Sequence, residues 1–296
     1  MTAAALDLSG APSPERYATL CARFLRTHGD LRTWAAGYGD LLPDSLLEPL
    51  CLMHVFHAPW QSAAELRLHN RMAAWLFALD NHAEEAATQA DLDALTDRCR
   101  RVLDGGEPDP ADAFGRCLKD IRAELRTLPL WPALGARWRE LLLDTLAAMR
   151  GERLLRHRMD TGGGAPTVEE YIANCDNAEV RIAYFTYWLS MDGTALLDHP
   201  GVLMPALWEA QVATRWANDY RSAHRKTGEP TALNARLLGI EPAESLRRAH
   251  AAAERCHRLL EPLLAASVPE AVVLDRMARA VVGFYGTSDY RPEGRI

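Results

Sequence analysis

The stretch Trp75-Leu76-Phe77-Ala78-Leu79-Asp80-Asn81-His82-Ala83-Glu84-Glu85 indicates both a helical fold and a candidate site. An apolar helical turn gives way at Asp80 to a cluster of acidic side chains. Asp80 and Glu84 lie four residues apart, so they share one face of a helix. Two such carboxylates can bind Mg²⁺, a hard cation that prefers oxygen ligands and can hold phosphate groups. A solvated helix end with its charges in water is the alternative interpretation.

A second stretch, from Asn218 to Glu229, also follows an apolar helix. Asn218 and Ser222 lie one turn apart and offer neutral oxygen atoms that suit Mg²⁺. The preceding helix carries Trp216 and looks buried, so polar groups at its end need partners. A surface helix of mixed charge is the alternative interpretation here.

Apolar residues recur at helical spacing through nearly the whole chain, as in Leu141, Leu142, Leu146 and Met149. Patterns of alternating apolar and polar residues, which predict strands, are almost absent. Short breaks rich in Gly and Pro occur near residues 105–110, 128–132, 161–166, 199–201 and 228–230. None is long enough to be a domain linker. We therefore predict an all-α protein, a single domain over residues 1–296 with about ten to twelve helices in one bundle and flexible ends at 1–13 and 292–296.

The composition excludes several classes of protein. With 48% hydrophobic and 25% charged residues, the chain is typical of soluble globular proteins. Its net charge of −7 argues against nucleic-acid binding, which needs clustered Lys and Arg. No apolar run approaches the ~20 residues of a membrane span, and no signal pattern opens the chain, so we expect a cytoplasmic protein. Six scattered cysteines show no CxxC pair or zinc spacing, which indicates buried thiols.

The two stretches together resemble the motifs of the bacterial class I terpene synthases. In that family an Asp-rich motif, DDxx(D/E) or DDxxxE, faces an NDxxSxxxE motif across the mouth of an apolar pocket. Asp80, His82, Glu84 and Glu85 match the first motif, and Asn81 stands where a second Asp is usual.

Further segments match the same family in the expected order. Asn218, Asp219 and Ser222 match the second motif, and Arg225 matches the basic residue that contacts diphosphate. The segment 166–171 resembles the start of the helix that carries the diphosphate sensor. The segment 284–291 resembles the closing segment, whose Arg-Tyr pair caps the diphosphate.

The chain also departs from the family pattern. Lys226 stands where the second motif has an acid, and a cation cannot ligate Mg²⁺. Glu229, eleven residues after Asn218, returns to nearly the same helix face and is a substitute candidate. Arg181 is the basic residue nearest to the expected sensor position. The pair Tyr290-Arg291 has the reverse of the common order.

The resemblance implies a central apolar cavity and a Mg²⁺-dependent reaction, with three ions, in which a prenyl diphosphate is ionised and the cation cyclises or rearranges. We expect a diterpene synthase that uses geranylgeranyl or copalyl-type diphosphate. A sesquiterpene synthase using farnesyl diphosphate and a weakly active or non-catalytic binding protein derived from a synthase are alternatives. A chain-elongating prenyltransferase is disfavoured because its second DDxxD motif is missing. A homodimer is one option for the oligomeric state, which the sequence leaves open.

Three sets of residues follow from the resemblance. The catalytic and metal-binding set is Asp80, Glu84, Asn218 and Ser222, with Glu229 as a further metal ligand. The diphosphate-binding set is Arg225, Arg181, Arg291, Arg215 and Tyr290. Aromatic faces can stabilise a cation in the cavity, and the candidates are Phe77, Tyr184, Tyr187, Trp188, Trp216 and Phe284. Plain core packing is the alternative role for each of these aromatic residues.

Overall fold

The computed structural model describes residues 13–86, 88–191, 193–223 and 233–290. Across these ranges all regular structure is helical, which confirms the predicted all-α bundle of ten to twelve helices. The α-helices are α1 (Pro14–Ala35), α2 (Asp44–His57), α3 (Ala63–Glu85), α4 (Gln89–Leu103), α5 (Ala113–Leu125), α6 (Trp131–Asp160), α7 (Val168–Ala173), α8 (Val180–Leu189), α9 (Ala195–Asp198), α10 (Pro200–Ser222), α11 (Pro242–Ala265) and α12 (Pro269–Thr287). Short 3₁₀-helices are η1 (Ala36–Leu41), η2 (Cys175–Ala178) and η3 (Ala235–Leu238).

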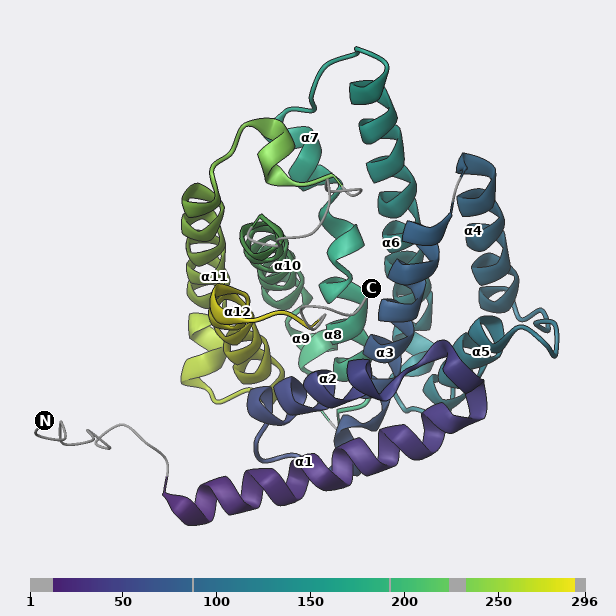
Figure 1. The fold of residues 1–296 in the computed structure, drawn as a ribbon. Helices are drawn as coiled ribbons and strands as arrows, with labels where there is room; N and C mark the ends of the chain where they lie inside the picture. The colour runs from purple at the N-terminus through teal and green to yellow at the C-terminus, as the bar shows by residue number, and fades with distance from the viewer. Residues whose placement is uncertain (1–12, 87, 192, 224–232, 291–296) are drawn as a thin grey trace, which may run out of the picture.

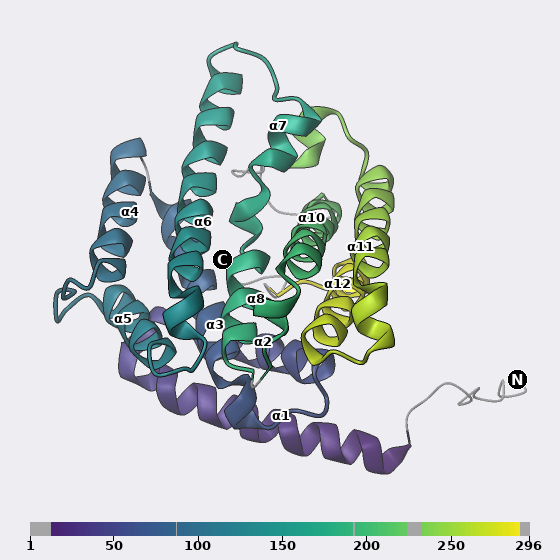
Figure 2. The same ribbon diagram turned by 180° about the vertical axis from the view of Figure 1, so that it is seen from behind.

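Helix α8 lies at the centre of the bundle. Every residue of this helix except Arg181 is buried, and it packs against α3, α6 and α10. Figures 1 and 2 show α6 and α11 on opposite sides with α8 and α10 between them, while α1 runs across one end beneath α2 and α3. The helices that carry the two candidate metal motifs, α3 and α10, therefore flank the same buried helix.

Large aromatic side chains join the helices in the interior. Trp75 of α3, Trp138 of α6 and Trp188 of α8 are fully buried. The indole of Trp138 donates a hydrogen bond to Thr186 Oγ1 over 2.8 Å, which joins α6 to α8. The indole of Trp75 donates to the carbonyl of Phe114 over 3.1 Å, which joins α3 to α5. Because each indole N–H has a partner, these residues fill the core without leaving a buried donor unpaired.

Local sequence signals explain where α3 begins. Ser62 accepts a hydrogen bond from the Glu65 backbone N–H, and the Glu65 carboxylate accepts from the Ser62 backbone N–H, which forms a capping box. From there the helix continues for 23 residues to Glu85. The cap fixes the register of the helix, and the acidic cluster therefore lies at its C-terminal end.

Two expectations from the composition can be compared with the structure. All six cysteines are free thiols, and only Cys21 among them is exposed. Over the described residues, no helix combines the length and the apolar character that crossing a lipid bilayer requires.

Candidate active site

The acidic motif occupies the last two turns of α3. Asp80 is half-buried, and Glu84 is exposed one turn further along. His82 lies on a different face, where its Nδ1 is 2.9 Å from the carbonyl of Ala78 and its ring stacks on Phe114 at 4.9 Å between centroids. The structure therefore separates His82, a structural residue, from the two carboxylates predicted to bind metal.

The position of these acids on α3 favours a bound cation. Glu84 and Glu85 lie in the last turn of the helix, where the helix dipole presents its negative end. Negative side chains at this end are electrostatically unfavourable, and the dipole effect amounts to about 0.3–1 kcal/mol for an exposed charge. A divalent cation beside Asp80 and Glu84 removes that repulsion.

The second motif ends α10. Asn218 and Ser222 are both half-buried and one helical turn apart, as predicted. Ser222 Oγ donates a hydrogen bond to the carbonyl of Asp219 over 3.1 Å, which leaves the lone pairs of its oxygen available to a ligand. Within the described ranges, no three His, Cys, Asp or Glu side chains come together as a metal site.

Asp219, which lies between Asn218 and Ser222 in the sequence, belongs to a buried polar network. Its carboxylate oxygens lie 2.9 and 2.7 Å from the hydroxyl of Tyr171, which donates to them. Arg215 Nε in turn donates to the Tyr171 hydroxyl oxygen and lies 3.8 Å from the Asp219 carboxylate. Burial raises the pKa of Asp219 to about 6, and Arg215 and Tyr171 oppose that rise. Arg215, predicted to contact diphosphate, is thus engaged by protein groups.

Glu152 of α6 extends this network to the chain that follows α10. Its carboxylate accepts a hydrogen bond from the backbone N–H of Leu233 over 2.8 Å, and it lies 3.5 Å from Arg215 Nη1. Arg215 Nη2 donates to the carbonyl of the same Leu233. Both backbone groups of Leu233 are therefore fixed by one ion pair. The sequence reasoning missed Glu152, because the charged run around it looks like a solvent-exposed face.

Arg181 lies at the start of α8, where η2 and α8 meet at a sharp break. Glu179, between them, has a φ of 64°, which is uncommon for a residue other than glycine. Arg181 Nη1 donates to both oxygens of Asp176 at 2.8 Å, and its guanidinium lies over the ring of Trp208. The side chain of Gln211 donates to the same Asp176 carboxylate. Arg181 thus joins η2 to α8 and α10.

An aromatic cluster lies between α3 and the end of α12. Tyr290 packs against Phe284 at 4.7 Å and against Phe77 at 5.5 Å between ring centroids. Tyr285 completes the cluster. In both views of the bundle the segment after α12 runs inward towards α3 and α8 (Figures 1 and 2). The structure therefore brings together Phe77 and Phe284, predicted to line a cavity, with Tyr290, predicted to contact diphosphate.

The remaining aromatic candidates have partners in the core. The hydroxyl of Tyr184 lies 2.8 Å from His57 Nδ1, and Tyr187 donates to Gln61 Oε1. The indole of Trp188 donates to the carbonyl of Glu270 at the start of α12. Trp216 packs against Tyr171 and beneath the guanidinium of Arg248. Three further candidates, Arg225, Glu229 and Arg291, lie outside the described residues, as does Lys226.

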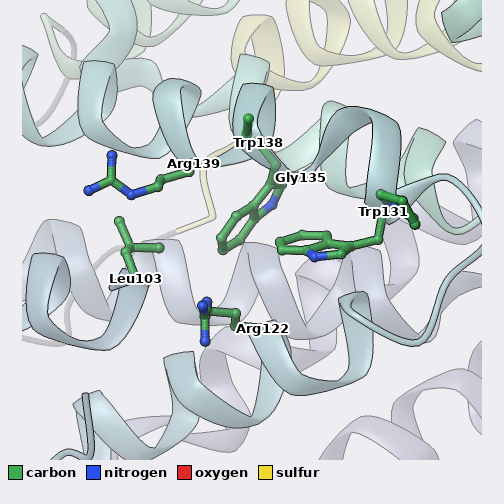
Figure 3. A pocket seen from close by; sticks show the side chains of 8 residues that line it. Leu103, Arg122, Trp131, Gly135, Trp138 and Arg139 are labelled. Carbon is green, nitrogen blue, oxygen red and sulfur yellow. The ribbon is translucent and has the colours of Figure 1, made fainter. Parts of the chain in front are cut away.

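Two surface pockets occur in the described chain, and the second borders the acidic motif. The first, of about 270 Å³, lies between α4, α5 and α6, where Trp131, Trp138, Arg122 and Arg139 line it (Figure 3). The second, of about 390 Å³, lies between the end of α3 and α4 beside His82 and Glu85. No candidate metal ligand lines either pocket.

Comparisons with known proteins show what the chain is similar to. Residues 71–238 match the family described as terpene synthase family 2, C-terminal metal binding. Over 272 residues the chain is 29% identical to an ent-pimara-9(11),15-diene synthase of Streptomyces sp. (strain KO-3988), a match that covers 91% of this chain and 92% of the relative.

Solved structures share the fold. Linalool/nerolidol synthase from Streptomyces clavuligerus, in complex with 2-fluorogeranyl diphosphate, superposes with a TM-score of 0.61 at 17% identity, over 92% of this chain and 96% of that one. Isoprene synthase from grey poplar leaves, in complex with three Mg²⁺ ions and dimethylallyl-S-thiolodiphosphate, gives 0.63 at 14% identity, over 91% and 55%. These likenesses establish the class I terpenoid synthase fold.

Proposed function

Since this chain belongs to the terpene synthase family and is a lyase of the terpene cyclase type, we propose that it ionises a prenyl diphosphate with the help of Mg²⁺. The allylic cation then cyclises or rearranges before it loses a proton or is captured by water.

One observation carries the proposal: two apolar helices that pack on the same buried helix, α8, both end in oxygen-bearing side chains. Asp80 and Glu84 end α3, and Asn218 and Ser222 end α10. Carboxylate, amide and hydroxyl oxygens are the ligands that Mg²⁺ accepts most readily. The residues present therefore fit the metal, and the structure of the poplar synthase with three Mg²⁺ ions supports the proposal of three ions.

When bound, Mg²⁺ supplies Lewis acidity that stabilises the negative charge developing on the departing diphosphate. The other contributions to the reaction come from side chains of the protein. Asp80 and Glu84 hold negative charge at the end of α3, while Phe77, Phe284 and Tyr290, each partly buried, offer aromatic faces beside it. Each aromatic face contributes about 0.5–2 kcal/mol to the stabilisation of a desolvated cation. A dry interior also keeps water from capturing the cation early.

We propose a C20 substrate, geranylgeranyl or copalyl-type diphosphate. The relative that is 29% identical over 91% of this chain is a synthase of a pimaradiene, a diterpene, and its length agrees with that of this chain. Farnesyl diphosphate, the substrate of a sesquiterpene synthase, is the second candidate and belongs in the same assay.

Four substrates test this function. The purified protein is incubated with Mg²⁺ and, separately, with geranyl, farnesyl, geranylgeranyl and copalyl-type diphosphate, and the organic extract is analysed by gas chromatography and mass spectrometry. We expect a cyclic C20 product from one of the last two, and no product when EDTA replaces Mg²⁺. A product from farnesyl diphosphate alone would move the assignment to a sesquiterpene synthase. A folded protein with no product from any substrate would favour the non-catalytic alternative.

A further inference from the structure

Five aromatic side chains form a buried cluster deep in the bundle, away from the metal motifs. His54 and His57 come from α2, His69 from α3, and Tyr184 and Tyr187 from α8. Each is less than 10% exposed, and His69 is only 1% exposed. Three imidazoles in one dry core are costly to bury. The proposed metal-binding acids and cavity aromatic residues give no function to these three histidines.

The hydrogen bonds of His69 define its protonation. Its Nδ1 lies 3.2 Å from the backbone carbonyl of Ala183. A carbonyl only accepts hydrogen bonds, so Nδ1 carries the hydrogen. Burial, with the neighbouring His54 and His57, lowers the pKa of His69 well below its ordinary value. The ring is therefore neutral, and Nε2 holds a lone pair.

That lone pair has no hydrogen-bond partner. Nε2 of His69 is completely buried, and among the described residues no donor reaches it. A buried polar atom without a partner is rare in folded proteins, and a catalytic role is one recognised reason for it. The same holds for His57 Nε2, but the partner of His57 is the Tyr184 hydroxyl, which can donate or accept. Of these two unpartnered nitrogens, only Nε2 of His69 is assigned the lone pair by the geometry.

The surroundings of His69 favour a ring that accepts a proton for a short time. His54 stacks against it at 3.8 Å and Tyr187 at 4.6 Å between centroids, and Tyr184 meets it edge-on at 4.7 Å. The two tyrosine rings offer π-electrons to a transient imidazolium. The cluster thus holds the ring rigidly, and the two tyrosine faces offset part of the penalty that burial and the neighbouring histidines impose on its charged form.

His69 is also aligned with the metal motif. It lies eleven residues before Asp80 on α3, which places the two side chains within ~20° of the same face and ~16 Å apart along the helix axis. Between them along the helix axis lies Phe77, whose ring contacts Tyr290. Burial raises the pKa of Tyr184, and Tyr290 adds to that rise, so Tyr290 also lies near Tyr184. Aromatic residues therefore continue from the acidic end of α3 down to His69.

From this arrangement we propose that His69 Nε2 is the base that ends the reaction by taking a proton from the terpenyl cation. This proposal rests on the proposed function. The C–H bond next to the cationic carbon breaks, its electron pair becomes the second bond of the alkene, and the proton forms an N–H bond at Nε2. A carbocation is so acidic that even a weakly basic imidazole accepts its proton. Since burial disfavours the imidazolium, the proton passes to water when the product leaves.

The test compares His69→Phe with His54→Phe. Both variants replace a buried ring of the same cluster, but only the first removes a buried nitrogen that has no hydrogen-bond partner among the described residues. Diphosphate release measures ionisation, and chromatography measures the products. For His69→Phe we expect diphosphate release within about threefold of the parent, and at least a tenfold fall in the main olefin relative to isomeric olefins and alcohols. For His54→Phe we expect the parent product profile.

Three results would overturn the proposal: an unchanged profile in folded His69→Phe, complete loss of its diphosphate release, or the same altered profile in His54→Phe. If the parent itself releases no diphosphate, the proposed function fails, which is a different result. If a variant does not fold, the proposal can still be tested on the parent protein by a measurement that needs no turnover. Nitrogen-15 NMR of histidine-labelled parent protein should show Nδ1 of His69 protonated and Nε2 bare, and a protonated Nε2 would exclude its role as base.

Discussion

The hydroxyl of Tyr171 lies 2.9 and 2.7 Å from the two carboxylate oxygens of Asp219, so the short helix α7 is tied to α10 between the candidate ligands Asn218 and Ser222. Because Arg215 donates to the same hydroxyl, the bond belongs to a largely buried network of three side chains. This network fixes the rotation of the last turns of α10, and with it the direction in which Asn218 and Ser222 point.

Tyr171→Phe should therefore affect both stability and metal dependence. Removal of the hydroxyl leaves Asp219 and Arg215 each short of one buried partner, and we expect a loss of about 1–3 kcal/mol in the free energy of unfolding. We also expect a higher Mg²⁺ concentration for half-maximal turnover. Urea denaturation and a Mg²⁺ titration measure the two effects. Tyr17→Phe, at a site 47% exposed on α1, is the control and should change neither.

The ion pair between Glu152 and Arg215 gives a second prediction. Glu152→Ala removes the acceptor for the Leu233 N–H and leaves Arg215 with fewer partners. The side chains of this pair are 17% and 11% exposed, and we expect a loss of about 2–4 kcal/mol in unfolding free energy, somewhat below the usual cost of breaking a fully buried pair.

The same helix provides the control for Glu152. Glu140 of α6 pairs with Arg137, and both side chains are largely exposed. Glu140→Ala should change the free energy of unfolding by less than about 1 kcal/mol. Equal losses in the two variants would mean that the Glu152 pair does not hold Leu233.

Asp80→Asn tests the metal site directly. The substitution keeps the size of the side chain and removes one negative charge from the end of α3. We expect turnover to fall at least about 100-fold, a loss of the size seen when one electrostatic group is removed from a preorganised site, with unchanged circular dichroism. Glu261→Gln on the exposed face of α11 removes the same charge elsewhere and should leave turnover intact. Parent-like turnover in Asp80→Asn would refute the assignment.

The buried histidines make the fold sensitive to acid. Burial lowers the pKa of His54 to about 4, and His57 and His69 also lie well below the ordinary value of 6.5. At a pH below 6.5 but above the lowered pKa values of the folded state, the unfolded chain binds more protons than the folded chain. The contribution of the neutral histidines to the free energy of unfolding is therefore fully present above about pH 6.5 and is lost as the pH falls. His54 alone accounts for about 3 kcal/mol by pH 4.

Urea unfolding from pH 7.5 to pH 5 measures this dependence. His54→Gln should reduce the slope of unfolding free energy against pH, because one lowered group is removed. His250→Gln, at an exposed position on α11, should leave the slope as in the parent. A slope identical in all three proteins would assign the acid sensitivity to carboxylates instead.

The helical spacing of apolar residues predicted those features of the fold that depend on local sequence alone. The apolar spacing in α3 and α10 placed both helices, and the change to polar side chains at Asp80 and Asn218 placed the motifs at their ends. The helical bundle followed from the same signal repeated along the chain. These features need no knowledge of which helices touch.

Features that depend on contacts between distant helices stayed hidden. His54, His57 and His69 look like unrelated polar residues in sequence, and their contact arises only when α2, α3 and α8 pack together. The histidine spacing of three residues at the end of apolar α2 was the one available signal. Arg181 pairs with Asp176 because η2 turns sharply before α8, and no periodic pattern encodes that turn.

Helix α8 is the spacer between the two helices that carry the proposed metal ligands. It packs against both α3 and α10, so the size of its buried side chains affects the separation of these helices. Mg²⁺ demands near-ideal octahedral geometry, whereas Ca²⁺ accepts more flexible coordination. If the proposed ligands hold Mg²⁺, a methyl group added or removed on α8 should therefore alter the preference between these ions, although it touches neither metal nor substrate.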